Sequence, residues 1–331
     1  MVNIVTGEVV DLTPEFWAHN VLPYPWEPGA KCPRWDEFLD QTLPGDKEAW
    51  DFLEEFLGCC FTNDIRIHKG VQLIGRRRAG KGLIIRIGER LIGADAFTTF
   101  KLDTWTATEN SYQTIIGKRL AAFPDESVKA KKWWGPRLDR GGLDDKSISL
   151  IKSITGGDKA KVGRKNIPAW EGFLPTKILI AGNRAMNFKD QTLSTRFINV
   201  AFGVSFEGRE DPELEDKLAE ELPGIAQKCV AGYHRLVARG RYIQPESGLK
   251  LGRQIRVETD PWELMADECF VQAPGEWIVK KDAFARFESW CKANPSAQLF
   301  EEASSDSLFS KRLRDLERFE GLRDFPRPHK T

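Results

Sequence analysis

Short runs of mostly apolar residues, each followed by glycine, proline or a charged residue, mark the strands that this chain is expected to form. They lie at 71–74, 120–123, 178–181 and 197–202. Runs of this kind are typical of strands that are covered on both faces of a sheet. Elsewhere the apolar residues recur at intervals of three and four, which predicts helices. The pattern therefore predicts an α/β fold with a parallel central sheet.

Helical periodicity dominates both ends of the chain, and four regions are expected. They are an irregular and helical N-terminal region (1–66), a core with the parallel sheet (67–206), a helical segment and linker (207–250), and a C-terminal module (251–331). In the C-terminal module the expected order is a helix, a strand at 277–279, a helix and a basic helix at 304–319. That order is typical of a winged-helix module, so the C-terminal module is expected to be winged-helix-like.

Turn and capping residues predict several element boundaries. Asp46 is expected to cap the second helix, and Gly58 is expected to end it. Asp211 is expected to cap a helix that follows the last strand of the core. Residues 241–257 read as a linker, and the glycines of 152–165 predict a hairpin there.

A glycine-bounded stretch separates the first strand from an apolar helix, and the functional interpretation depends on it. Its candidate nucleotide-binding residues are Gly75, Arg78, Ala79, Gly80, Lys81, Gly82 and Leu83. Glycines let successive backbone N–H groups point inward around an anion, and the helix N-terminus adds partial positive charge. Lys81 would reach the β- and γ-phosphates of ATP. The alternative is a surface turn rich in glycine and arginine.

The loop departs from the usual phosphate-binding pattern at one position. A serine or threonine normally follows the loop lysine, and its hydroxyl binds Mg²⁺. Here Gly82 and Leu83 follow Lys81. Mg²⁺ would therefore depend on the phosphates, on water and on carboxylates elsewhere in the chain.

Polar residues that follow two further strands are candidates for catalysis. Asp125 and Glu126 follow the strand at 120–123. We expect Asp125 to bind the metal ion and Glu126 to polarise water for attack on the γ-phosphate. Asn183 follows the strand at 178–181, at the edge where open α/β sheets bind ligands, and is a candidate for orienting that water. The alternative for the acidic pair is a solvated turn.

Basic residues supply two more candidates. Arg196 directly precedes the last strand, and it is a candidate arginine finger that supplies charge to the transition state. Lys159, Lys161, Arg164 and Lys165 lie in the expected hairpin, where positive charge would suit a phosphate backbone. The alternative for this segment is an exposed charged hairpin without a ligand.

Composition limits the classes of protein that need to be considered. Lys and Arg total 49 and Asp and Glu total 49 in 331 residues, so the net charge is zero and any DNA contact must come from local clusters. The six cysteines form no CxxC pair and the four histidines are scattered, which predicts reduced thiols and no structural zinc. The chain shows no signal-peptide pattern and no apolar run of ~18 residues, so we expect a cytoplasmic protein without a membrane partner.

The order of these motifs resembles the superfamily 3 helicase portion of phage and plasmid primase–helicases, the poxvirus-type group. The order is the glycine-bounded loop, the acidic pair, the basic segment, the strand that ends at Asn183, Arg196 and then helices. The resemblance covers most of the chain. It implies an AAA+ ATPase core at 67–206, a ring hexamer, ATP and Mg²⁺ as ligands, and ATP sites at the subunit interfaces.

The resemblance also implies a role for each matching residue. Lys81 corresponds to the loop lysine and Asn183 to the sensor asparagine, and Arg196 corresponds to a finger that acts on a neighbouring subunit. Asp125 and Glu126 correspond to the family's acidic motif, and the basic segment to the hairpin that grips DNA in the central channel. A primase part commonly precedes such a helicase, but no primase acidic motif precedes the loop. The chain is therefore expected to be a stand-alone helicase or the helicase piece of a longer protein, with a primase as a partner.

Three functional hypotheses follow. The first is an ATP-dependent, ring-forming DNA helicase for replication of a phage, plasmid or other mobile element. The second is a catalytically degenerate protein that binds ATP and acts as a DNA-binding or loading factor, because Gly82 lacks the hydroxyl. The third is a nucleoside monophosphate kinase, since those enzymes also have glycine after the loop lysine. The strand that ends at Asn183 and the C-terminal module argue against the third hypothesis.

Overall fold

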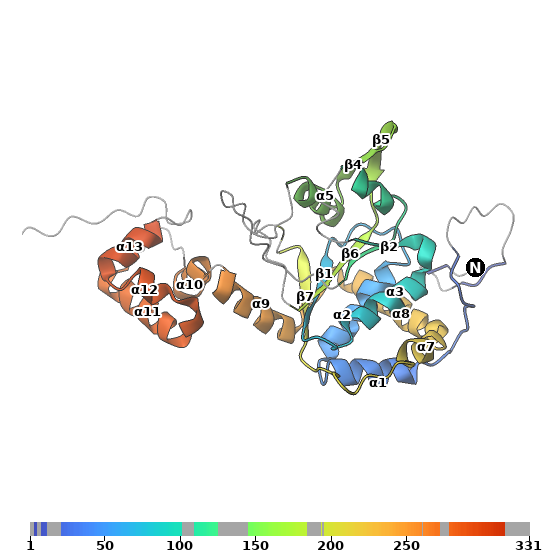
Figure 1. Cartoon of the computed structure of the whole chain (residues 1–331), viewed down its shortest axis with the longest axis horizontal. Coiled ribbons are helices and arrows are strands. Elements are labelled where there is room, and N and C mark those ends of the chain that lie inside the picture. The colour runs from blue at the N-terminus through green and yellow to red at the C-terminus, as the bar shows by residue number, and fades with distance from the viewer. Residues whose placement is uncertain are drawn as a thin grey trace, which may run out of the picture. The chain divides into compact units, whose positions relative to one another are not determined.

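The chain forms two compact units in the computed structural model, Met1–Leu249 and Lys250–Thr331. The structure describes residues 3–4, 8–11, 21–100, 109–124, 145–183, 193, 195–259, 261–271 and 278–314. Figure 1 labels the helices and strands of both units.

The first unit is built on a five-stranded parallel sheet with the strand order β2-β3-β6-β1-β7. The strands are β1 (Gly70–Gly75), β2 (Phe97–Thr99), β3 (Leu120–Phe123), β6 (Lys177–Gly182) and β7 (Phe197–Phe202). Every neighbouring pair is parallel, which confirms the α/β class and the parallel sheet that the apolar runs predict. Because β1 lies between β6 and β7, the segments that follow β1 and β6 meet at one edge of the sheet.

Helices cover both faces of this sheet. They are α1 (Pro33–Thr42), α2 (Lys47–Cys59), α3 (Lys81–Ile92), α5 (Asp145–Gly156), α7 (Leu214–Ala219) and α8 (Leu222–Arg239), with short 3₁₀ turns at Ala94–Ala96 and Glu109–Ile115. Alternate residues of β6 enter different clusters: Leu179 packs with α1, α2, α3 and α8, whereas Ile178 and Ile180 pack with α5. This alternation is the period of two that a strand imposes, and it separates the core into two layers.

Helices α2 and α8 approach so closely that each requires a glycine at the contact. A Cβ atom on Gly58 would lie 2.0 Å from the carbonyl oxygen of Cys229, and one on Gly232 would lie 2.8 Å from the backbone of Glu54. The prediction that Gly58 ends α2 is therefore wrong, because the helix continues through it to Cys59. Asp46 does cap α2, since its side chain accepts a hydrogen bond from the backbone N–H of Ala49.

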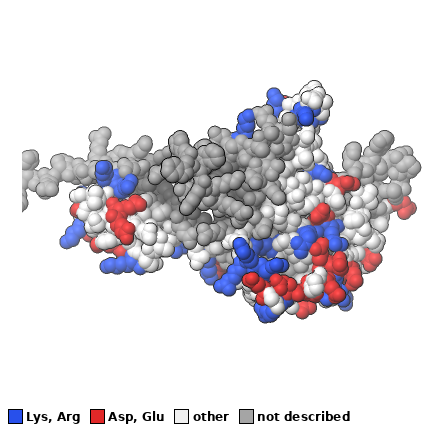
Figure 2. Space-filling view, viewed as in Figure 1, with Lys and Arg blue, Asp and Glu red and all other residues white. Residues whose placement is uncertain are grey.

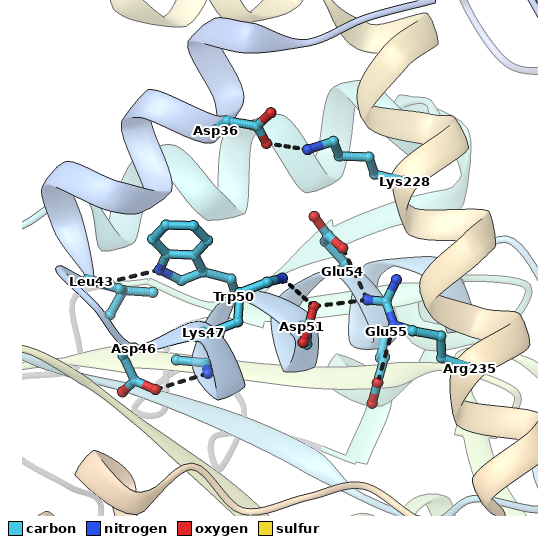
Figure 3. Close-up of polar contacts among 11 residues, drawn as sticks. Asp36, Leu43, Asp46, Lys47, Trp50, Asp51, Glu54, Glu55, Lys228 and Arg235 are labelled. Atoms are coloured by element: carbon cyan, nitrogen blue, oxygen red, sulfur yellow. Dashed lines mark hydrogen bonds and ion pairs between the residues drawn. The ribbon is translucent and has the colours of Figure 1, made fainter. Parts of the chain in front are cut away.

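Buried carboxylates and partly exposed arginines join the same two helices. The side chains of Glu54 and Glu55 are 8% and 2% exposed, and Arg235 of α8 lies 3.0 Å from the Glu54 carboxylate (Figure 3). Arg239 contacts Glu55 at 2.5 Å. Burial raises the pKa of Glu54, and the hydrogen bond from Arg235 opposes that shift.

A two-stranded antiparallel hairpin, β4 (Lys159–Arg164) and β5 (Ile167–Phe173), extends from the sheet-bearing unit beside α5 (Figure 1). Its turn is at Lys165 and Asn166, so the hairpin lies further along the chain than the glycines predict. Gly156 is instead the last residue of α5, and Gly157 follows it before β4. Gly157 has a φ of +69°, a left-handed conformation that favours glycine.

The helices after the sheet differ from the predicted boundaries. Asp211 does not cap a helix, because α7 begins at Leu214; the Asp211 carboxylate accepts from the backbone N–H of Glu213 at 2.9 Å. Helix α8 ends at Gly240 in a left-handed conformation with φ +77°. The predicted linker at 241–257 is wrong from Glu246 onward, because α9 occupies Glu246–Thr259.

The second unit contains the end of α9 with α10 (Pro261–Cys269), α11 (Lys280–Ala293), α12 (Leu299–Glu302) and α13 (Asp306–Arg314). Its core contains Phe287, whose ring centroid is 4.7 Å from Phe309 and 5.5 Å from the stacked Trp262. Within its described residues this unit has no strand: Ile278 and Val279 directly precede α11 without pairing. Residues 278 and 279 therefore do not form the strand that a winged-helix module needs. Of the basic helix expected at 304–319, the structure describes α13, Asp306–Arg314.

Candidate active site

The loop after β1 has the backbone geometry that a phosphate-binding loop requires at its two bounding glycines. Gly75 is the last residue of β1, and a Cβ atom there would lie 1.9 Å from the carbonyl oxygen of Phe202. Gly80 directly precedes α3 with φ +89°, and a Cβ atom there would lie 2.9 Å from Thr42 and 3.0 Å from the ring of Phe38. Only glycine fits either position without displacing its neighbours.

Lys81 is the first residue of α3, and its side chain is folded into the loop. The residue is 8% exposed, and its Nζ donates to the carbonyl oxygens of Gly75 at 2.8 Å and Arg76 at 2.5 Å. The same Nζ lies 3.5 Å from Oδ1 of Asn183. Asn183 directly follows β6, so the order of the strands brings these two predicted site residues together.

The remaining loop residues surround this lysine in different environments. Arg76, Arg77 and Arg78 are exposed, whereas Ala79 is 1% exposed and packs in the core. Leu83 is also buried, while Gly82 is exposed to solvent at the start of α3.

The segment between β7 and α7 lies along the outer side of the loop. The carbonyl oxygens of Arg77 and Arg78 accept hydrogen bonds of 2.9 Å from Oγ of Ser205 and the backbone N–H of Phe206. Arg78 also contacts Glu210 at 3.5 Å. The sequence alone gives no signal for this contact, because the two segments are about 130 residues apart and neither contains a motif for the other.

The predicted acidic pair cannot be placed beside this lysine. Asp125 and Glu126 lie outside the described residues. β3 precedes them, and its last residue, Phe123, is buried and in register with Ile180 of β6. Asn183 follows that position by three residues. The assignment of Asp125 to the metal ion and Glu126 to water therefore remains a prediction.

Arg196 lies at the opposite edge of the sheet, directly before β7. Its Nη1 donates to the carbonyl oxygen of Lys152 at 2.8 Å. His68 and Lys69 lie nearby at the amino end of β1, and burial lowers the pKa of both side chains, with further lowering by the charge of Arg196. Arg196 and Lys81 are thus separated by the length of β7, and the structure does not bring them together within one chain.

The basic hairpin residues have different exposures. Lys159 and Lys161 of β4 and Lys165 of the turn are exposed, and they alternate with Ala160 and Val162, which are buried against the layer that contains α5. Arg164 is partly buried and donates from Nε to the carbonyl oxygen of Pro168 at 2.9 Å. On β5, Ile167 and Phe173 are 55% and 50% exposed.

Charge is distributed unevenly over the part of the surface that can be seen. Figure 2 shows Lys and Arg atoms at the projecting hairpin without neighbouring acidic atoms in that view, whereas basic and acidic atoms alternate over the rest of the sheet-bearing unit. The hairpin also carries one carboxylate on β5, because Glu171 is exposed and in register with Lys161.

The loop residues fit the phosphates of a nucleotide better than they fit a metal ion. The close glycines, the start of α3 and the buried Lys81 together form a set of donors for an anion. By contrast, Gly82 offers no hydroxyl, and the described residues contain no group of three or more His, Cys, Asp or Glu side chains that could hold a metal ion. The six cysteines are all free.

Comparisons with known proteins support the fold. No protein-family model matches the chain. The A form apo structure of the NrS-1 C-terminal region superposes with a TM-score of 0.53 at 11% identity, over 92% of this chain and 65% of that chain. This chain therefore spans less than two thirds of that solved region. At this identity the similarity concerns the fold alone.

Two further solved structures are more distant. An apo structure of the NrS-1 C-terminal region has a TM-score of 0.48 at 15% identity, over 80% of this chain and 70% of that chain. JCV helicase with a bound acetamide compound has a TM-score of 0.34 at 14% identity, over 62% and 67%. Both scores are too low to support an inference. No described helix is long and apolar enough to cross a membrane. The sheet, its flanking helices and the loop after β1 form an α/β fold of the phosphate-loop type, shared with the NrS-1 C-terminal region.

Proposed function

We propose that this chain is the motor subunit of an ATP-driven, ring-forming DNA helicase that serves replication of a phage, plasmid or other mobile element. The observation that carries the proposal is the position of Lys81, buried in the loop and 3.5 Å from Asn183 at the same sheet edge. In this proposal Lys81 and the loop backbone bind the phosphates of ATP, and Asn183 orients the attacking water. Asp125 and Glu126 would bind Mg²⁺ and activate that water.

The position of Arg196 supports an oligomer. Arg196 precedes β7 and Lys81 follows β1, so in parallel strands the two residues belong to opposite edges of one sheet. An arginine at that edge can reach a nucleotide only if a second subunit presents its own loop there. A ring, and a hexamer in particular, provides such an interface around every subunit.

The hairpin supports DNA as the partner. Lys159, Lys161 and Lys165 are exposed on a projecting element, so several copies arranged around a ring would concentrate positive charge in its channel. Single-stranded DNA is the proposed occupant, because Ile167 and Phe173 on the neighbouring strand offer apolar surface for unpaired bases. A primase, in the same polypeptide or in a separate one, would be the partner that loads or uses the unwound strand.

The experiment that tests the proposal is ATP hydrolysis with Mg²⁺, with and without single-stranded DNA. We expect DNA to stimulate turnover by the parent protein and Lys81→Ala to abolish it. Lys47→Ala is the matched control, because Lys47 is an exposed lysine of α2 that pairs with Asp51 one turn along its own helix. Loss of turnover in both variants would contradict a specific role for Lys81.

The other two hypotheses give different results in the same assay. A degenerate DNA-binding or loading factor would bind ATP without turnover even when DNA is present, and Gly82 keeps that hypothesis open. A nucleoside monophosphate kinase would transfer phosphate from ATP to a nucleoside monophosphate. The helicase is preferred because a kinase has no use for an arginine at the far edge of the sheet or for a projecting basic hairpin.

A further inference from the structure

The first two turns of α3 place an arginine where a phosphate-binding loop normally has its hydroxyl. Gly82 and Arg86 are four residues apart, so they lie on the same face of the helix. A Cβ atom built on Gly82 would lie 3.3 Å from Nη1 of Arg86. The guanidinium therefore occupies the space that a serine or threonine side chain would need at residue 82.

A carboxylate from another element holds this guanidinium in place. Glu215 of α7 accepts from Nε of Arg86 at 2.5 Å, and its other oxygen accepts from Nε and Nη2 of Arg90 at 3.1 and 2.9 Å. Burial acts to raise the pKa of Glu215, but the hydrogen bonds from Arg90 and Arg86 hold the pKa below its usual value. Glu215 is thus ionised at neutral pH, and it orients Arg86 through Nε while Nη1 lies beside Gly82 at the start of the helix.

The start of α3 is also where the phosphates of a nucleotide would bind. Arginine binds phosphate through paired N–H donors, and it carries its charge at every physiological pH. Arg90 remains on Glu215, so the carboxylate keeps a counterion if Arg86 turns toward a phosphate. The side chain of Arg86 is 52% exposed and has room for that movement.

We infer that Arg86 binds the phosphates of a nucleoside di- or triphosphate in the place of the hydroxyl-held Mg²⁺, so that nucleotide binding to this chain does not require Mg²⁺. The inference rests on the proposed function, because it assumes that the loop binds a nucleotide. It concerns binding alone, and turnover can still require a metal ion. It also explains why glycine stands at residue 82, since a larger side chain would displace the guanidinium.

The test measures the dissociation constant of a fluorescently labelled ADP, with Mg²⁺ and with EDTA. We expect the parent constant to change by less than about threefold when Mg²⁺ is removed. Arg86→Gln is expected to weaken binding in EDTA by roughly tenfold, the effect of losing one charge-assisted hydrogen bond. Arg90→Gln is the matched control: it removes the same charge and a contact to Glu215 one turn further along, and it should bind as the parent does.

A double variant replaces the guanidinium with the hydroxyl that phosphate-binding loops normally have. Gly82→Thr combined with Arg86→Gln supplies a hydroxyl and removes the guanidinium, so its ADP binding should depend on Mg²⁺ by roughly tenfold or more. Thermal unfolding of each variant without nucleotide checks that the fold is retained. The parent measurement needs no variant, so a poorly folded substitution does not leave the inference without a test.

Three outcomes would overturn the inference. The first is a parent protein that binds ADP only with Mg²⁺, and the second is Arg86→Gln binding as tightly as the parent in EDTA. The third is an equal loss of ADP affinity in Arg86→Gln and Arg90→Gln, which would show a general effect of charge. If the parent binds no nucleotide under any condition, the proposed function fails as well. The three outcomes above differ from that result, because in each of them the parent still binds ADP.

Discussion

Arg196 provides the sharpest test of the proposed motor, because its position makes a prediction that a site within one chain cannot satisfy. β7 has six residues between Arg196 and the level of the loop, so at ~3.3 Å per residue the arginine lies roughly 20 Å from Lys81 along the sheet. An arginine side chain is far shorter than that distance. Arg196→Ala should therefore leave nucleotide binding unchanged and reduce turnover by about 10³-fold or more, the range found for arginine fingers.

The assay mixes two inactive proteins. In Lys81→Ala the loop is defective, and in Arg196→Ala the finger is defective. In a ring assembled from equal amounts, about one quarter of the interfaces combine an intact loop with an intact finger from the next subunit. We expect the mixture to recover roughly that fraction of the parent ATPase, although each component alone is inactive.

Two controls make the result interpretable. Lys81→Ala mixed with the double variant Lys81→Ala/Arg196→Ala contains no intact loop and should stay inactive. Arg196 also donates to the carbonyl oxygen of Lys152, so the melting temperature of Arg196→Ala must be compared with that of the parent. A stable Arg196→Ala protein with full turnover, or a mixture as inactive as its components, would refute the reasoning.

Three further predictions concern other parts of the first unit. Glu55→Gln should lower the free energy of unfolding by about 1.5–3 kcal/mol in denaturant titrations, because the 2%-exposed carboxylate accepts a charge-assisted hydrogen bond from Arg239. Arg66 holds the pKa of Asp64 well below its usual range, so Asp64 stabilises the fold above about pH 4 and this contribution is lost as the pH falls. Asp64→Asn should therefore make the free energy of unfolding depend less on pH in the acid range. Lys159→Ala should weaken binding of single-stranded DNA and reduce the slope of log K against log salt by about 0.7.

Each of these predictions has a control variant or a result that would contradict it. Lys47→Ala removes an exposed pair within α2 and should change the free energy of unfolding by no more than ~0.5 kcal/mol, so an equal loss in Glu55→Gln would contradict the role of burial. An unchanged acid profile in Asp64→Asn would exclude the contact with Arg66 as its cause. Lys118 is a partly exposed lysine outside the hairpin, and Lys118→Ala should leave the salt slope as it is in the parent.

The strands of the core and the loop after β1 were predictable because their signals are local. An apolar run such as 178–181 is buried whichever strands flank it, and Gly75 and Gly80 are required by the bend of the chain between a strand and a helix. The position of Asn183 at the end of its strand follows from the same local pattern. Its approach to Lys81 does not, because it depends on β6 lying next to β1 although about 100 residues separate them.

Two of the wrong boundaries come from local preferences that the folded protein does not follow. Gly58 has a low helix propensity, so by itself it predicts the end of a helix. In the folded protein its missing side chain allows α8 to pack against α2, and tertiary contact overrides the local preference. The segment at Glu246–Thr259 is similar, because a weak local pattern predicted a linker where the structure has a helix.

The sequence by itself determined the class of fold, the loop with Lys81, and the missing hydroxyl at Gly82, since each depends on residues that are neighbours in the chain. Only the tertiary structure decided which of these features meet. It put Arg196 at the edge opposite the loop, and it brought Glu215 from 129 residues away to orient Arg86 beside Gly82. Spacing within one helix identifies a shared face, but the partners of that face are chosen by packing between distant segments, which no local pattern records.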